Sequence, residues 1–381
     1  MNNLSFEKYT KNMNEYILEG LDNSKLLDNR SQVIYDENGN LSKDIINKYN
    51  KYGFYVFENI VKIDELNVLK EEVDKVIDGA PISPGSKLNK KGEPALFRDL
   101  RKEPYIYAKP LSDPLGGTKL NKGRHPSKMK APKPKKNSPE FTVKMLHGNL
   151  HLMKSALRLY GHPDLLKIAS DILGDDFVPY NEVSFIKEPG LGPSIAWHRD
   201  GTTHWESEDW DLNAHGFNFM IQLYPSTPAN CVWVIPGSHK EKYIDIPKLI
   251  QKSGTDQIKN AVPMTCNAGD VFMMNRQILH GSFANTSKER RVTINEGFFP
   301  RKRVRNITVT HLDGRVETFD DKRINERSKM IAYGINARSN FYRNEKKFNY
   351  KHLSEKIKII DFSKNSWSFD LKDYNILDMY L

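Results

Sequence analysis

Cysteine is almost absent from this sequence: its 381 residues include only Cys231 and Cys266. Two distant thiols cannot form a disulfide framework or a cysteine-based zinc site, so we expect both to be reduced and buried. The sequence also lacks any run of about 18 apolar residues that would predict a membrane-spanning helix. Its first residues lack the basic stretch and apolar run of a secretory signal. We therefore expect a cytoplasmic protein that does not enter membranes.

Acidic residues are missing between Pro114 and Pro139, although the chain as a whole carries a net charge of +10. This segment is rich in lysine, proline and glycine, and it cannot bury enough apolar surface to fold alone. We interpret it as a long loop or disordered part of a basic insertion over residues 80–140. The segment also contains no Phe, Trp or Tyr, so it lacks the stacking platform that single-stranded nucleic acids need.

Two stretches have the periodicity of amphipathic helices. Apolar residues recur at three- and four-residue steps from Ile63 until Gly79, and a second helix begins at Pro163 and ends before Gly174. A short β-prone run over residues 52–57 precedes the first helix. The residues before about 50 are polar and only weakly periodic.

After residue 180 the pattern changes to short apolar runs separated by turn residues, which is typical of a jelly roll. We predict a mixed α and β protein with a double-stranded β-helix (jelly-roll, cupin-like) core and flanking helices. The expected organisation is a single catalytic domain over residues 1–381. It comprises an N-terminal helical part (45–180), the core (181–300) and a C-terminal extension (301–381). The predicted core strands are Glu182–Lys187, Ser194–His198, Phe217–Leu223, Cys231–Ile235, Asp270–Asn275 and Val292–Phe298.

One of these strands leads into a candidate metal site. Side chains alternate along a strand, so His198 and Asp200 share one face and can converge on one ion. Two histidines and a carboxylate form the facial triad of non-haem iron(II) oxygenases, which leaves coordination positions open. By chain order alone, either His239 or His280 could be the third ligand, and either could be a structural histidine.

The residues after His280 favour it over His239. Arg291, Thr293 and Asn295 alternate with apolar residues, which predicts a strand with a polar face that carries a guanidinium. A buried guanidinium needs an anion and pairs with carboxylates in a bidentate way. It would suit a dicarboxylate cosubstrate that also binds the metal. The alternative for Arg291 is a surface ion pair.

Together these stretches resemble the phytanoyl-CoA dioxygenase family of iron(II)/2-oxoglutarate oxygenases, over roughly residues 45–300 and with the basic insertion as a gap. One departure is Cys231, where the family usually has glycine. The motifs that carry the resemblance are Tyr52-Gly53-Phe54, Phe185–Gly190, Trp197–Gly201, Asn230–His239, Gly269-Asp270-Val271, His280-Gly281-Ser282, Asn285, Ser287 and Arg291.

The resemblance implies a role for each candidate. Its cofactors would be Fe(II), 2-oxoglutarate as cosubstrate and O2, with succinate and CO2 released. His239 would then be structural. The implied iron ligands are His198, Asp200 and His280, and the implied contacts of 2-oxoglutarate are Arg291, Ser282 and Lys187.

The substrate is less constrained. The positive charge favours a small anionic metabolite. By the family resemblance, the presence of Asp200 favours hydroxylation of this metabolite, and desaturation and ring closure stay open. Two alternatives remain: a protein that binds or modifies nucleic acid through its basic insertion, or a non-catalytic jelly-roll binding module. His204 and Trp205 could line the pocket mouth, whereas the run Arg301–Arg303 is expected to face solvent. Residues 333–338 are interpreted as a lid or a packing element, and the oligomeric state stays open.

Overall fold

The computed structural model describes residues 5–97, 100, 103–200, 216–310, 316–353, 360, 362 and 370–371. His204 and Trp205 lie outside these residues. The helices are α1 (Phe6–Lys25), α2 (Lys43–Tyr52), α3 (Ile63–Asp78), α4 (Asn149–Leu152), α5 (Lys154–Leu159), α6 (Pro163–Leu173), α7 (Ile246–Ser253), α8 (Arg301–Val304) and α9 (Asp321–Phe341), with 3-10 turns η1 (Leu120–Gly123), η2 (Ser238–Lys240) and η3 (Lys351–Leu353). None of the helices in these residues combines the length and hydrophobicity needed to cross a bilayer.

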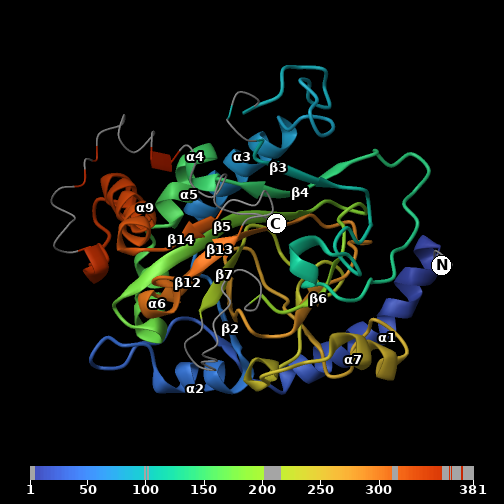
Figure 1. Cartoon of the computed structure of the whole chain (residues 1–381), viewed down its shortest axis with the longest axis horizontal. Coiled ribbons are helices and arrows are strands. Elements are labelled where there is room, and N and C mark those ends of the chain that lie inside the picture. Colours follow the sequence, from blue (N-terminus) through green and yellow to red (C-terminus); the bar gives the residue numbers. More distant parts are fainter. Residues whose placement is uncertain are drawn as a thin grey trace.

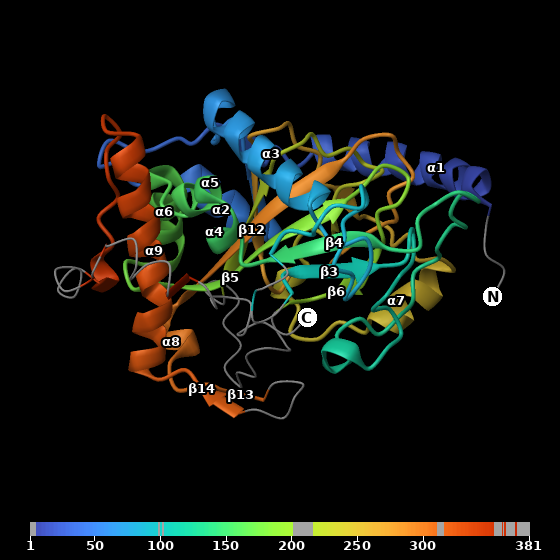
Figure 2. The same cartoon turned by 90° about the horizontal axis from the view of Figure 1, so that it is seen from above.

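Two sheets, antiparallel except for the parallel pair of strands Arg30–Ser31 and Phe54–Phe57, face each other to form the core, as Figures 1 and 2 show from two sides. The strands are β1 (Arg30–Ser31), β2 (Phe54–Phe57), β3 (Tyr105–Ala108), β4 (Thr142–His147), β5 (Phe177–Lys187), β6 (Ile195–His198), β7 (Phe217–Gln222), β8 (Trp233–Val234), β9 (Val262–Pro263), β10 (Val271–Asn275), β11 (His280–Ser282), β12 (Arg291–Pro300), β13 (Thr308–Thr310) and β14 (Val316–Thr318). The order of the larger sheet is β1-β2-β10-β7-β12-β5-β4-β3, and that of the smaller is β6-β11-β8-β9.

Between β5 and β12 the chain crosses repeatedly from one sheet to the other, with β8 and β9 consecutive in the smaller sheet. Strands β5, β7, β10 and β12 lie in the larger sheet, while β6, β8, β9 and β11 form the smaller one. This order is that of a double-stranded β-helix, so the predicted fold class is confirmed. All six predicted core strands are present with shifted ends. Within the predicted core, residues 181–300, the two strands that sequence reasoning missed are β9 and β11. They are only two and three residues long, which is too short to show a two-residue periodicity.

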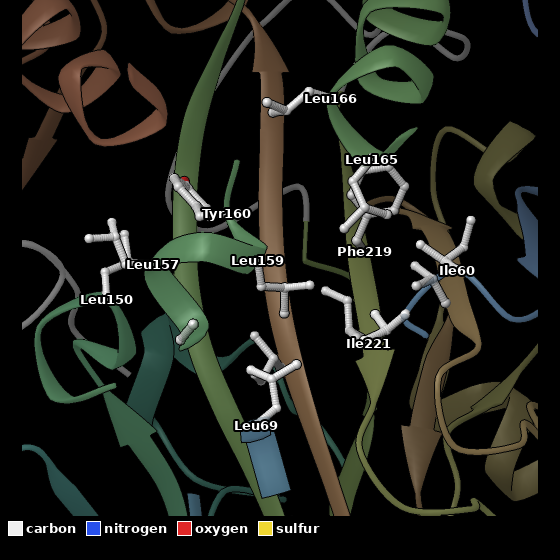
Figure 3. Packing of buried hydrophobic residues seen from close by; sticks show 14 of the residues in the cluster. Ile60, Leu69, Leu150, Leu157, Leu159, Tyr160, Leu165, Leu166, Phe219 and Ile221 are labelled. Carbon is white, nitrogen blue, oxygen red and sulfur yellow. The ribbon is translucent and has the colours of Figure 1, made fainter. Parts of the chain in front are cut away.

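Helices cover the outer face of the larger sheet (Figure 2). In the close-up of Figure 3, Leu165 from α6 lies beside Phe219 of β7, and Leu157 from α5 lies beside Leu150 from α4. Leu69 from α3 belongs to the same buried cluster. Strand β12 contributes Val292, Ile294 and Phe298 to the same cluster. Its alternate residues therefore point to the opposite face of the sheet, where the two sheets enclose a cavity.

Both predicted helices are confirmed as α3 and α6. The polar N-terminal stretch contains two further helices that were not predicted from the sequence. It contains α1 and α2, whose first turns are capped by the hydroxyls of Ser5 and Ser42. Helix α1 buries only Tyr9, Met13, Tyr16 and Gly20, and this narrow stripe explains its weak periodicity.

Of the two interpretations of the basic segment, a long loop or a disordered stretch, the structure agrees with the loop. This loop is fastened to the core at several points. Asp113 accepts hydrogen bonds from the backbone N–H groups of Gly116 (2.9 Å) and Met129 (2.8 Å), which closes the loop on itself. Asp256 accepts another from the N–H of Lys130 at 2.6 Å. In Figure 1 the segment runs as a teal loop beside β6.

The C-terminal helix α9 is a packing element. Its Arg338 donates two hydrogen bonds to the carboxylate of Glu65 on α3, at 2.6 and 3.1 Å, and both side chains are about 95% buried. A second carboxylate, Glu345, also pairs with this guanidinium. The ion pair therefore joins the C-terminal part of the chain to its N-terminal half. The division into one catalytic domain with the stated parts stays a prediction.

We predict that Arg338→Met lowers the free energy of unfolding by about 3–5 kcal/mol, because it leaves the carboxylate of Glu65 buried without its partner. Urea denaturation would measure the loss. Arg343→Met is the matched control, since Arg343 is exposed and its replacement should change stability by less than about 0.5 kcal/mol. Equal stabilities for the two variants would contradict the prediction.

Candidate metal centre and cavity

Three predicted side chains meet between the sheets. His198 ends β6 and His280 begins β11, and the two residues are direct partners in the antiparallel pairing of these strands. Asp200 follows β6 by two residues and returns to the same face. One ligand atom from each of the three lies within 4.8 Å of the others. The spacing is suitable for a single metal ion.

Both imidazoles are oriented by the backbone. The Nδ1 atom of His198 lies 2.8 Å from the carbonyl of Ala196, and that of His280 lies 3.0 Å from the carbonyl of Ile278. A carbonyl accepts only, so Nδ1 carries the proton and Nε2 is left with a lone pair for a metal. Burial, reinforced by the neighbouring His198, lowers the pKa of His280 to about 3, which keeps this ring neutral.

Asp200 is held from several directions. Its backbone N–H donates to the carbonyl of Arg276, and its Oδ2 accepts from the amide of Asn218 at 3.0 Å. Arg276 donates to Asn218 at 2.8 Å and lies 3.9 Å from the same carboxylate. Burial alone would raise the pKa of Asp200, but Arg276, His198 and nearby cations hold it well below its usual range.

The close packing around Asn218 requires a glycine on β12. A Cβ atom at Gly297 would lie 2.8 Å from the Asn218 side chain and closer still to Asn181. Gly297 therefore leaves room for the two amides that position Arg276 and Asp200.

The predicted cosubstrate residues gather in the same cavity. Arg291 and Lys187 are direct partners on β12 and β5, and Ser282 follows His280 on β11. Arg291 donates to the carbonyl of Asn230 (3.0 Å), Lys187 to that of Phe283, and Ser282 to that of Cys231 (2.9 Å). Burial, followed by repulsion from Arg291, lowers the pKa of Lys187 well below its usual range.

Arg291 and Lys187 have no counter-ion among the residues that the structure describes. Within this described part of the chain, neither side chain has a carboxylate at ion-pair distance, and the Nε of Arg291 has no hydrogen-bond partner. Two buried, adjacent cations are unfavourable unless an anion joins them. This end of the cavity is thus suited to a carboxylate group.

Sequence reasoning missed the contribution of the insertion. Arg124 places Nη1 3.3 Å from Oδ1 of Asp200, and the ring of His125 lies 4.2 Å from that of His198. Burial lowers the pKa of His125 well below its usual range. These two are the only arginine and the only histidine between Pro114 and Pro139. That departure from a lysine-rich composition was the available signal.

Other cavity residues gave no such signal. Lys144 is the extra residue of a β-bulge on β4, and Arg276 lies in the turn before β11. A bulge redirects one side chain, which a period-two pattern cannot reveal. Burial lowers the pKa of Lys144 to about 8.

The remaining candidates lie elsewhere. His239 on η2 packs against Gly53 and its Nε2 lies 3.1 Å from the carbonyl of Asn50, so it is structural. Arg301 pairs with Asp321 at the surface, and it does not line the cavity. Both cysteines are free and buried, as expected.

A family model decides between the possible interpretations of this site. The model described as phytanoyl-CoA dioxygenase (PhyH) matches residues 49–293, well over half of the chain. The chain belongs to the phytanoyl-CoA dioxygenase family. Among curated relatives, a "Phytanoyl-CoA dioxygenase" of Arabidopsis thaliana is 22% identical and covers 66% of this chain and 87% of its own. A "Phytanoyl-CoA dioxygenase 1" of Oryza sativa subsp. japonica is 29% identical. That match covers 26% of this chain and 37% of the relative.

Solved structures of similar fold include EctD from S. alaskensis with 2-oxoglutarate and 5-hydroxyectoine. It is 19% identical, with a TM-score of 0.48, over 71% of this chain and 80% of that one. AviO1 from Streptomyces viridochromogenes Tue57 is 20% identical, with a TM-score of 0.46. The match covers 67% of this chain and 92% of AviO1. Because both TM-scores lie below 0.5, the assignment depends on the family model and on the site itself.

This member of the phytanoyl-CoA dioxygenase family is a non-haem iron(II)/2-oxoglutarate-dependent dioxygenase that uses Fe(II), 2-oxoglutarate and O2. The donor set fits that metal, because two neutral imidazoles and one carboxylate leave positions open for a cosubstrate. The buried cations Arg291 and Lys187 fit the cosubstrate's dicarboxylate. The expected cofactors and the expected enzyme class are therefore confirmed.

We predict that Asn218→Ala weakens Fe(II) binding by about 10- to 100-fold, because Asp200 loses a hydrogen bond that orients it. Anaerobic calorimetric titration with Fe(II) would give the dissociation constants. Circular dichroism of both proteins would verify that the variant is folded. An unchanged dissociation constant would show that the amide does not orient the carboxylate.

Proposed function

We propose that His198, Asp200 and His280 bind iron(II), and that the enzyme hydroxylates a small anionic metabolite with release of succinate and CO2. The observation that carries the proposal is the direct pairing of His198 with His280 across β6 and β11, with Asp200 on the same face. Three protein ligands would leave positions on the metal open for 2-oxoglutarate and O2. Family membership makes a non-catalytic binding module the weaker alternative.

The bound iron and 2-oxoglutarate would supply the oxidising chemistry with O2, through decarboxylation of the keto acid. The chain's own groups would bind and orient. Arg291 would hold the distal carboxylate of 2-oxoglutarate, with Lys187 and Ser282 as further donors beside it. Asn218 and Arg276 would keep Asp200 directed at the metal. The closed β-helix would exclude water from the reacting atoms.

The charge of the cavity supports an anionic substrate. Among the described residues that line it, five are cationic and only Asp200 is acidic; the cations are Arg124, Lys144, Lys187, Arg276 and Arg291. Iron(II) and the doubly charged 2-oxoglutarate offset each other. Even with Lys187 counted as neutral, the lining remains positive. An anionic group on the substrate would compensate this charge.

We predict that the wild-type protein with Fe(II), ascorbate and 2-oxoglutarate releases succinate slowly without a substrate, and that Asp200→Ala abolishes the release. The substitution removes one of three metal ligands, so bound iron is lost as well. Succinate would be quantified by chromatography, and iron by elemental analysis after desalting. A wild-type protein that binds no iron would end the proposal.

We predict that Arg291→Gln weakens 2-oxoglutarate binding by about 10- to 150-fold, because a hydrogen bond to a charged group contributes about 1.5–3 kcal/mol. Fe(II) affinity should stay within about twofold, since Arg291 does not touch the ligands. Calorimetric titration of the iron-loaded proteins would separate the two constants. Equal 2-oxoglutarate affinities would place the distal carboxylate elsewhere.

A further inference from the structure

His125 is a buried polar group that the proposed mechanism does not use. Its exposed fraction is 1%, and neither ring nitrogen has a hydrogen-bond partner among the residues that the structure describes. An imidazole can donate from one nitrogen and accept at the other, and leaving both buried without partners is unfavourable. Because the ring lines the cavity beside the metal centre, a bound ligand is the natural partner.

Arg124 brings a positive charge to the same place. Its side chain is 94% buried and lines the cavity. Its Nη1 lies 3.3 Å from Oδ1 of Asp200, and the planar fork of a guanidinium matches the geometry of an oxyanion. The described residues that line the cavity include five cations and a single carboxylate, that of Asp200.

The part of the insertion around Arg124 and His125, here called its tip, is held beside the metal centre by hydrogen bonds on both sides. The N–H of Gly117 donates to the carbonyl of His125 at 2.8 Å, and Asp113 binds the backbone at Met129. Asp256 accepts from Lys130 and, through its carbonyl, from the indole of Trp197, the neighbour of His198. The tip is therefore fastened to the strand that carries the metal ligand, and it is preorganised for binding.

A role as a fourth metal ligand does not explain His125. The ligand atoms that lie within 4.8 Å of one another come from His198, Asp200 and His280, and His125 is not among them. Cosubstrate binding does not explain His125 either, because the buried basic groups suited to the distal carboxylate of 2-oxoglutarate are Arg291 and Lys187. Dioxygen carries no charge and needs no such donors, so the substrate is the component that would pair with this group.

We propose that Arg124 and His125 form a subsite for an oxyanion of the substrate, a carboxylate or a phosphate-type group, next to the metal centre. This inference rests on the proposed function and assigns substrate recognition to the insertion. Arg124 binds the oxyanion through its N–H donors, and His125 donates a further hydrogen bond to it. The substrate carbon to be oxidised is thereby fixed relative to the iron.

The test uses the full-length protein loaded with Co(II), which reports ligand changes in its visible absorption, and with 2-oxoglutarate. Inorganic phosphate, methylphosphonate and acetate are the probes, so that the phosphate-type and carboxylate arms are separate. We expect a saturable spectral change with at least one probe while 2-oxoglutarate remains bound. Arg124→Gln and His125→Ala should each raise the dissociation constant of that probe by about tenfold or more, which corresponds to the loss of one charge-assisted hydrogen bond.

Two further variants make the result specific. His125→Gln keeps a donor and an acceptor, so it should recover part of the affinity that His125→Ala loses. Lys128→Gln removes one charge from an exposed position of the same loop, and it should bind the probe like the wild type. Co(II) and 2-oxoglutarate affinities should stay within about twofold in the two His125 variants and in Lys128→Gln. Because Arg124 also contacts Asp200, every probe titration, including that of Arg124→Gln, is made at saturating Co(II).

Three results would overturn the subsite: no saturable response to any probe, displacement of 2-oxoglutarate by the probe, or equal probe affinities in the wild type and in the Arg124 and His125 variants. In each of these cases normal binding of Co(II) and 2-oxoglutarate would leave the proposed function intact. Failure of the wild type to bind Co(II) and 2-oxoglutarate would instead overturn both proposals.

Discussion

The site depends on the register between β6 and β11. His198 and His280 can share a metal only because they are direct partners across these strands. A slip of one residue would turn one imidazole to the opposite face of the sheet. Because β6 and β11 are only four and three residues long, their own hydrogen bonds contribute little to fixing that register, and packing must supply the rest.

Aromatic packing on the outer face of the smaller sheet provides this support. Trp197 and Trp233 both meet Phe283 edge-on, and Tyr16 of α1 stacks on Trp233 with ring centroids 4.5 Å apart. The hydroxyl of Tyr16 also donates to the carbonyl of Ile258. Helix α1 therefore covers the sheet that carries both histidines.

The sequence was most informative where side-chain periodicity reports on the environment. The alternation around Arg291 predicted a strand with one apolar and one polar face, and His198 and Asp200 were placed on one face by the same reasoning. Periodicity failed for β9 and β11, which are too short, and for Lys144, which a bulge redirects. It also failed for the segment around Arg124 and His125, because the hydrogen bonds of Asp113 and Asp256 that fasten this loop leave no local pattern.

The fastened insertion places one group of cavity residues on a loop and leaves the others on the strands of the β-helix. The strands of the β-helix hold the groups for the metal and for 2-oxoglutarate, and their spacing permits little change. The tip around Arg124 reaches the same centre from a loop whose outer residues face solvent. With the substrate role that we propose for Arg124 and His125, a change in the length or composition of this loop would alter substrate preference and leave the paired strands that carry His198 and His280 in place.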